Sequence, residues 1–236
     1  MARTIKIDNA ELKRREHKKR KGTPKQIVCR ILIVCEGEKT ERNYFKSFDK
    51  NYNGTFIYEL DLQGGGINTI GVVDKAIELR EKAQTPYDRV WAVFDKDSFS
   101  SKNFNGAITK ATANNIDCAW SNEAFELWLL LHFYDRRTGM PRTEYEKALT
   151  DAVNSSGKYK KKVKYKYKKN DTEIKKIIDQ YGSQKDAIRR AEALEQSYND
   201  KKYSDQNPCT TVYKLVRQII GEDEELNQHL TEKVEQ

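Results

Sequence analysis

Three short apolar runs, each followed by acidic residues, constrain the fold of this chain more than any other feature. The runs cover 31–35, 90–94 and 116–120. The acids that follow them are Glu36, Asp95, Asp97, Glu123 and Glu126. Such runs predict buried strands, and because helical patterns separate them we expect parallel neighbours in one sheet. The carboxyl ends of parallel strands share one edge, where ligands normally bind. The acids should therefore converge into an oxygen-rich pocket of the kind that Mg²⁺ needs.

The pattern of the first 140 residues predicts a doubly wound, mainly parallel α/β sheet. Strands are expected at 31–35, 56–62, 89–94 and 116–120, and helices from Thr40 (a predicted N-cap) and at 69–84, 104–115 and 123–134. From about residue 142 the pattern is helical with no convincing strand, and helices are expected at 143–154, 171–181, 183–199 and 209–220. The predicted parts are a flexible basic N-terminal arm, an α/β domain, a helical extension with a basic segment and an acidic tail, at 1–26, 27–140, 141–221 and 222–236.

The net charge of +8 is concentrated in two basic runs. Residues 1–30 hold eleven Lys and Arg against three acids, whereas 222–236 hold six acids and one lysine. The second run holds the lysines Lys158, Lys160, Lys161, Lys162, Lys164, Lys166, Lys168 and Lys169. Basic runs on a nearly neutral body predict a polyanionic partner, and we favour nucleic acid over solvated segments with no partner. Tyrosines between the lysines could stack on unpaired bases. Alternatively, they pack inward.

Several classes of protein are disfavoured by the sequence. It has no apolar stretch near 18 residues, which argues against a membrane protein, and no secretory signal at its start. Its four cysteines lack paired spacing, which favours reduced thiols in a cytoplasmic protein. A Walker A motif is absent, so the chain is not expected to hydrolyse ATP itself.

Asp95 and Asp97 are the first candidates for a metal site. Alternation along a strand would point both carboxylates to one side, so that both reach one cation. Alternatively, they cap the following turn or helix. Glu36 directly follows the first strand, and Gly37 after it permits close approach of the backbone. Glu36 is therefore a candidate metal ligand or general base, with a salt bridge to a nearby basic residue as the alternative.

Glu126 lies in an apolar segment that is predicted to be a buried helix. A buried carboxylate is costly unless it is paired or bound to a metal, so Glu126 should have a partner. That partner is a metal ion, His132 or an arginine. Glu41 and Glu123 are supporting candidates, and the alternative for each is that it only favours the first turn of a helix.

Five strings in the chain resemble the signature of the RloB family. They lie at 34–45, 94–97, 122–129, 132–133 and 207–212. RloB proteins are bacterial, resemble the Toprim fold, and are associated with abortive-infection or restriction loci beside an ABC-type ATPase of the RloA kind. The resemblance implies a Toprim-like domain at 27–140, in which Glu36 acts in acid/base chemistry or metal binding and Asp95 and Asp97 hold Mg²⁺. Glu41 departs from the related nuclease pattern, because it follows Glu36 by five positions and not four.

The residues and the resemblance together predict a Mg²⁺- or Mn²⁺-dependent nuclease. It would cleave RNA, tRNA included, or DNA as the effector of an anti-phage defence system, with an RloA-type ATPase as its partner. Glu36, Asp95 and Asp97 would lie at the catalytic centre, and Glu126 would be a further ligand. The alternative is a non-catalytic Toprim-like adaptor that binds nucleic acid or the ATPase through its basic segments. No oligomeric state is predicted.

Overall fold

The computed structural model describes residues 26–48, 51–53, 55–97, 99–199 and 202–235. The basic arm predicted at 1–26 therefore lies almost wholly outside the described residues. Within the described ranges, no helix is both long enough and apolar enough to span a bilayer.

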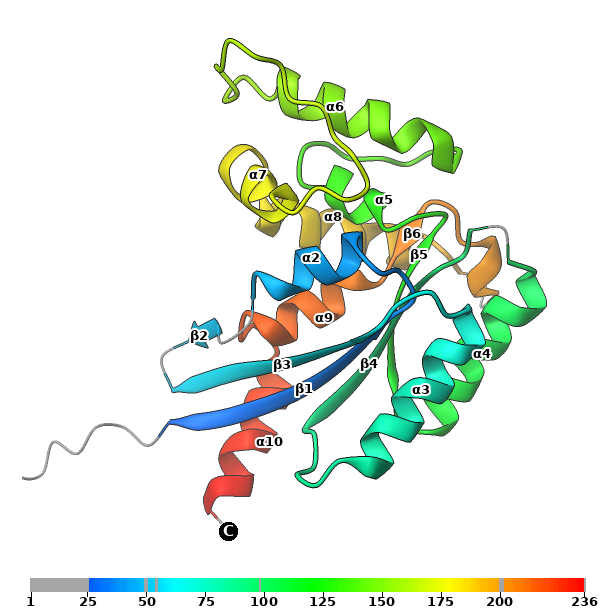
Figure 1. Cartoon of the computed structure of the whole chain (residues 1–236), viewed down its shortest axis with the longest axis vertical. Coiled ribbons are helices and arrows are strands. Elements are labelled where there is room, and N and C mark those ends of the chain that lie inside the picture. Colours follow the sequence, from blue (N-terminus) through cyan, green and yellow to red (C-terminus); the bar gives the residue numbers. More distant parts are fainter. Residues whose placement is uncertain (1–25, 49–50, 54, 98, 200–201, 236) are drawn as a thin grey trace, which may run out of the picture.

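A six-stranded sheet in the order β2-β3-β1-β4-β5-β6 forms the centre of the molecule (Figure 1). Four strands are parallel, namely β3 (Phe56–Gly64), β1 (Ile27–Cys35), β4 (Arg89–Asp95) and β5 (Asp117–Asn122). The edge strands β2 (Asn51–Asn53) and β6 (Cys209–Thr210) are antiparallel to their neighbours. The predicted mainly parallel α/β class is confirmed, and the architecture is consistent with a Toprim-like fold.

Both faces of the sheet are buried, and successive apolar side chains of β1 point alternately to one face and to the other. Ile31 and Ile33 belong to one core, and Leu32 and Val34 belong to the other. The second core is closed by α3 (Thr69–Lys82) and α4 (Ser101–Ala113). The first is closed by α2 (Thr40–Lys46), α5 (Glu126–Leu130), α6 (Tyr145–Ser155), α7 (Ile174–Tyr181), α8 (Gln184–Gln196) and α9 (Val212–Ile219). Figure 1 shows α3 and α4 on one side of the sheet and α2 and α9 on the other.

The helix predicted at 123–134 is much shorter in the structure, where α5 covers only Glu126–Leu130. Backbone groups at both ends of the predicted helix have partners in other segments. The carbonyl of Glu123 accepts a hydrogen bond from Asp97 N at 3.1 Å, and the carbonyl of His132 accepts one from Ser183 N at 2.8 Å. Tertiary hydrogen bonds therefore replace the outer turns of this helix.

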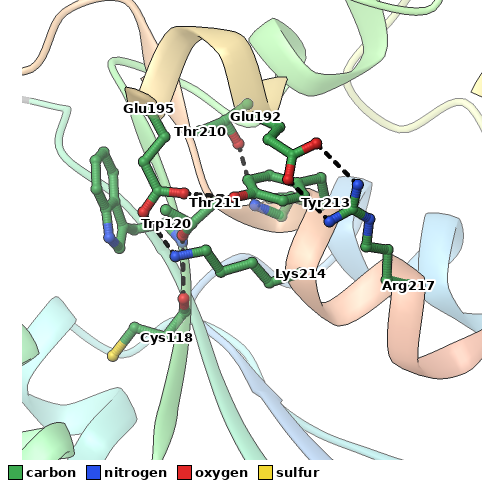
Figure 2. A network of polar contacts seen from close by, with 10 residues as sticks. Cys118, Trp120, Glu192, Glu195, Thr210, Thr211, Tyr213, Lys214 and Arg217 are labelled. Carbon is green, nitrogen blue, oxygen red and sulfur yellow. Dashed lines mark hydrogen bonds and ion pairs between the residues drawn. The ribbon is translucent and has the colours of Figure 1, made fainter. Parts of the chain in front are cut away.

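Strand β6 was not predicted, and it ties the C-terminal part of the chain to the sheet. Thr211 is the N-cap residue of α9, but its side chain makes no capping bond. Its hydroxyl instead donates to the carbonyl of Cys118 and accepts from Trp120 N, both at 3.0 Å (Figure 2). Thr210 adds a hydroxyl contact of 2.9 Å to Ser121. The prediction that the region after residue 141 contributes no strand was therefore wrong.

Helix α9 is also fastened to α8 by charged groups. Arg217 pairs with both carboxylate oxygens of Glu192, at 3.1 and 2.9 Å. Glu195 accepts from Tyr213 Oη and Lys214 Nζ, both at 2.6 Å (Figure 2). The paired donors on α9 hold α8 in a defined position over β6.

The predicted acidic tail contains helix α10 (Glu224–Glu235), which packs against β1. Leu226 and Leu230 are buried on its inner face. Asn227 Oδ1 accepts from Tyr58 Oη at 2.8 Å, and Lys233 pairs with Asp88 at 2.6 Å. The acids of this segment are therefore carried by an ordered, amphipathic helix.

Candidate functional site

A pocket of about 280 Å³ opens at the carboxyl ends of β1 and β4. Five acidic residues line it, namely Glu36, Glu38, Glu41, Asp95 and Glu126. Three cations, Lys39, Arg142 and Lys169, line it as well. The remaining lining residues are Gly37, Thr40, Gly66 and Asn170. The acids come from different elements, and the parallel sheet topology brings them to one place, as the sequence predicted.

Glu36 is held at the end of β1 by two hydrogen bonds. Its Oε2 accepts from the backbone N–H of Asp95 at 3.1 Å, and its Oε1 accepts from Thr69 Oγ1 at 3.3 Å. Thr69 is the first residue of α3, so the hydrogen bonds of this carboxylate connect the end of β1 to β4 and to α3. The side chain is half-buried, which leaves it access to the pocket.

Glu41 lies close to Glu36 because the turn between them contains a glycine. A Cβ atom at Gly37 would collide with the carboxylate of Glu41, so a larger residue there would displace this carboxylate from its position. Glu41 is in the first turn of α2 and is only 9% exposed. Thr40, by contrast, makes no capping bond: the N-cap residue is Lys39, and the Thr40 hydroxyl donates to the carbonyl of Lys169. The cap prediction for Thr40 was wrong.

Asp95 and Glu126 are the most buried acids of the pocket, at 6% and 3% exposed. Asp95 is the last residue of β4, and Glu126 is the first residue of α5. Glu126 Oε1 accepts from Tyr167 Oη at 3.2 Å. The sequence predicted a partner for Glu126, and this partner is a tyrosine that was not considered.

Burial and mutual repulsion make the ionised state of this pocket unfavourable. Burial raises the pKa of Glu36, Glu41, Asp95 and Glu126, and that of Asp95 lies well above its ordinary value. The charge of Glu41 raises the pKa of Asp95 further, and so does the charge of Glu126. The charges of Arg142 and Lys169 offset only part of the rise in the pKa of Glu41. A cation bound among the carboxylates would remove the repulsion.

The donor set consists of carboxylate oxygens, which suits Mg²⁺ or Mn²⁺. Among the described residues, however, no group of three or more His, Cys, Asp or Glu side chains is placed so as to hold one metal ion. The acids therefore share a pocket without being positioned as the ligands of one ion. The chemistry of their oxygens fits a hard divalent cation.

Asp97 does not join Asp95 in the pocket. Strand β4 ends at Asp95, and Asp97 has a positive φ of 39° in the turn that follows. The alternation used to pair the two side chains therefore does not extend to Asp97. Its carboxylate forms an ion pair with Arg142. Asp97 thus contacts the pocket through the guanidinium group that lines it.

Glu123 and His132 lie away from the pocket lining. Glu123 is half-buried and contributes its backbone carbonyl to the turn after β4. His132 is buried, contacts the carbonyl of Trp128 through Nδ1 at 3.0 Å, and stacks edge-on against the Trp128 ring. Burial lowers the pKa of His132 to about 3, so the ring is neutral. His132 is therefore a core residue and does not pair with Glu126.

The basic strap (residues 158–169) connects α6 to α7 (Figure 1), and its last residue, Lys169, lines the pocket. All eight of its lysines are exposed. Its tyrosines point inward, which is the alternative that the sequence left open. Tyr167 is buried against Glu126, Tyr165 Oη donates to Asp171 at 2.5 Å, and Tyr159 Oη donates to the carbonyl of Val163 at 3.0 Å. The tyrosines therefore anchor the strap, and the lysines face solvent.

Sequence reasoning missed Arg142, Tyr167 and Thr69. Arg142 stands alone in a polar stretch before α6, so no local pattern marked it. For Tyr167, the sequence left base stacking and inward packing open, and nothing in it pointed to Glu126 as the partner. Thr69 follows the Gly64-Gly65-Gly66 turn at the predicted start of a helix. That position was the only signal in the sequence that Thr69 lies near the strand ends.

The comparisons with known proteins give one match. A family model described as RloB-like protein matches residues 31–219, which is most of the chain. The curated proteins and the solved structures contain no match at the threshold used. The matched range includes every residue that lines the pocket and the whole basic strap.

Proposed function

We propose that this chain, which belongs to the RloB-like protein family, is a metal-dependent nuclease that cleaves phosphodiester bonds in RNA or DNA. One observation carries the proposal: five acids, three of them buried, and three cations line a single pocket at the carboxyl ends of the parallel strands. Such a cluster is costly to keep for stability alone, and clusters of this kind are typical of functional sites. The resemblance adds anti-phage defence and an RloA-type ATPase partner to the proposal.

Each acid has a role that follows from its position. Asp95, Glu41 and Glu126 are the buried carboxylates that would hold Mg²⁺ or Mn²⁺. When bound, such an ion lowers the pKa of a water molecule and neutralises charge on the phosphate. Glu36 is more exposed and is oriented by Thr69 Oγ1 and Asp95 N, so it is placed to accept a proton from that water. Its raised pKa brings it closer to neutral pH, where proton transfer is most efficient.

The first test is a calorimetric titration with Mn²⁺ of the wild type and of Asp95→Asn. The wild type should bind Mn²⁺, and the variant should bind it at least about tenfold more weakly, because it loses a charged ligand. Asp74→Asn is the matched control, because Asp74 is an exposed acid on α3 that pairs with Lys110 outside the pocket. Equal binding by all three proteins would contradict a metal site at Asp95.

Cleavage is tested with the same variants on labelled single-stranded RNA and DNA, in the presence and absence of the ATPase. Asp95→Asn and Glu36→Gln should lower the cleavage rate by about a hundredfold or more, as removal of a general base does, and Asp74→Asn should retain it. Full activity of Asp95→Asn would rule out the proposed centre. Cleavage by the wild type that persists in EDTA would rule out metal dependence.

A second function, that of a nucleic-acid-binding adaptor, is favoured by the exposure of all eight strap lysines. An adaptor would need the strap and not the acids. Replacing the eight lysines by glutamine should then abolish defence in cells, whereas Asp95→Asn should leave it intact. The nuclease proposal expects both changes to abolish defence.

A further inference from the structure

The acid pocket has a cationic side that metal binding does not use. Arg142 comes from the turn before α6, and Lys169 is the last residue of the basic strap. Both residues line the same pocket as the acids, and so does Lys39. The charge of Arg142 offsets part of the rise in the pKa of Glu36, Glu41 and Asp95. A phosphate bound close to acidic side chains needs cationic groups such as these to offset the repulsion between negative charges.

The strap leads directly to this cationic side. Its backbone is fixed along α6, because Asn154 Oδ1 accepts from Tyr165 N at 3.0 Å and Thr150 Oγ1 accepts from Tyr167 N at 3.0 Å. Two hydrogen bonds fix the strap to the pocket: Tyr167 Oη donates to Glu126, and the Lys169 carbonyl accepts from the Thr40 hydroxyl. The eight exposed lysines therefore lie along an anchored strap, and the last of them, Lys169, lines the pocket.

We infer that Arg142 and Lys169 form a phosphate subsite at the mouth of the acid pocket, and that the basic strap guides the backbone of a polynucleotide into it. This inference rests on the proposed function for the identity of the reacting group. The ligand it specifies is a chain of phosphodiesters and not a mononucleotide, because the strap adds eight exposed cations along one path. Arg142 donates from a planar fork suited to two phosphate oxygens, while Lys169 supplies a point charge.

Arg142 forms an ion pair with Asp97. Both side chains of this ion pair are about one-third exposed, at 32% and 34%, so solvent and a phosphate can reach them. A phosphate would compete with Asp97 for the guanidinium group. Removing the charge of Asp97 should therefore leave binding as strong as before or strengthen it, whereas removing Arg142 should weaken it.

The experiment measures binding and not cleavage. Fluorescence anisotropy is recorded in Ca²⁺ buffer with labelled single strands of about 20 nucleotides, one of RNA and one of DNA, and a gel confirms afterwards that they are intact. Arg142→Gln and Lys169→Gln should each raise Kd by about three- to tenfold and lower the salt dependence by about one counterion. Arg189→Gln and Lys102→Gln, at exposed positions on α8 and α4, should stay within about twofold of the wild type.

Asp97→Asn separates a phosphate contact from a structural role of Arg142. If Arg142 only held the turn after β4 in place, Asp97→Asn would weaken binding as much as Arg142→Gln does, and the subsite would be ruled out. Kd values of Arg142→Gln and Lys169→Gln that match the controls would also rule it out. A third outcome is that both variants bind more weakly while the wild type cleaves neither strand. This outcome would support the subsite and reject the nuclease. The RNA and DNA arms identify the polynucleotide that the subsite prefers.

Discussion

At the scale of single residues, the unusual feature of this protein is that its pocket acids oppose folding in the absence of a cation. Burial raises the pKa of Asp95 far above that of an unfolded aspartate. Below the ordinary carboxyl pKa, Asp95 is protonated in both the folded and the unfolded protein, so its burial does not lower the free energy of unfolding through ionisation. As the pH rises towards the folded-state pKa, the unfolded chain releases protons that the folded protein retains, so the free energy of unfolding falls.

Asp95→Asn should reduce this loss. In EDTA, the melting temperature of the wild type should fall further between about pH 5 and pH 8 than that of Asp95→Asn, and at the upper pH the variant should melt a few degrees higher. Differential scanning calorimetry at several pH values measures both quantities. Mn²⁺ should stabilise only the wild type. Parallel pH profiles for the two proteins would show that Asp95 is not under electrostatic strain.

The bond between Tyr167 and Glu126 also acts at this scale. Tyr167→Phe removes a buried donor to a carboxyl group, and it should lower the free energy of unfolding by about 1–3 kcal/mol. Tyr159→Phe is the control, because that hydroxyl bonds to the Val163 carbonyl within the exposed part of the strap. Urea denaturation should show a change of less than about 0.5 kcal/mol for the control. An equal loss in both variants would argue against an anchor at Glu126.

At the scale of elements, the sequence predicted the strands of the parallel sheet well, because each is a short apolar run bounded by polar residues. Ile31, Ile33 and Trp91 are buried as those runs require. Its failures were non-local. Thr211 bonds to β5, whose residues are about ninety positions away, and Thr40 bonds to the Lys169 carbonyl. No local pattern encodes such partners, and a capping residue and a cross-strand contact look alike in sequence.

Helix α10 gives a prediction at the same scale. Its acids could in principle shield the basic strap, but Figure 1 shows α10 at the opposite end of the molecule from the segment between α6 and α7. The triple change Glu224→Gln/Glu225→Gln/Glu232→Gln, at exposed positions, should therefore leave the nucleic-acid affinity within about twofold. Anisotropy measures it. A large gain in affinity would show that these acids reach the basic strap.

The inner face of α10 should matter for stability instead. Leu230 is 1% exposed and packs in the core beside β1. Leu230→Ala should lower the free energy of unfolding by about 2–4 kcal/mol, because it removes buried methyl groups and leaves a cavity. Val234→Ala, at a half-exposed position on the same helix, should cost much less. Urea denaturation of both variants tests whether α10 is docked.

At the scale of the whole molecule, the candidate site depends on both halves of the chain. The α/β part supplies Glu36, Asp95 and Glu126, whereas Arg142 and Lys169 come from the part predicted as an extension. Strand β6 and helix α9 from that part also complete the sheet and cover one of its faces. The acids could be predicted because they follow strands. The cations could not, because only the tertiary fold brings them to the same pocket.

The contacts of the strap have a consequence for protein synthesis. A ribosome makes Glu36, Glu41 and Asp95 early. Lys169, whose carbonyl accepts a hydrogen bond from the Thr40 hydroxyl, follows Thr40 by 129 positions. The residues of β6, which close the sheet edge, are made later still. A nascent chain therefore lacks the assembled pocket until the residues up to Asn170, the last that lines it, have left the exit tunnel. If the finished protein attacks nucleic acid, this order of emergence spares the messenger and the ribosome that produce it.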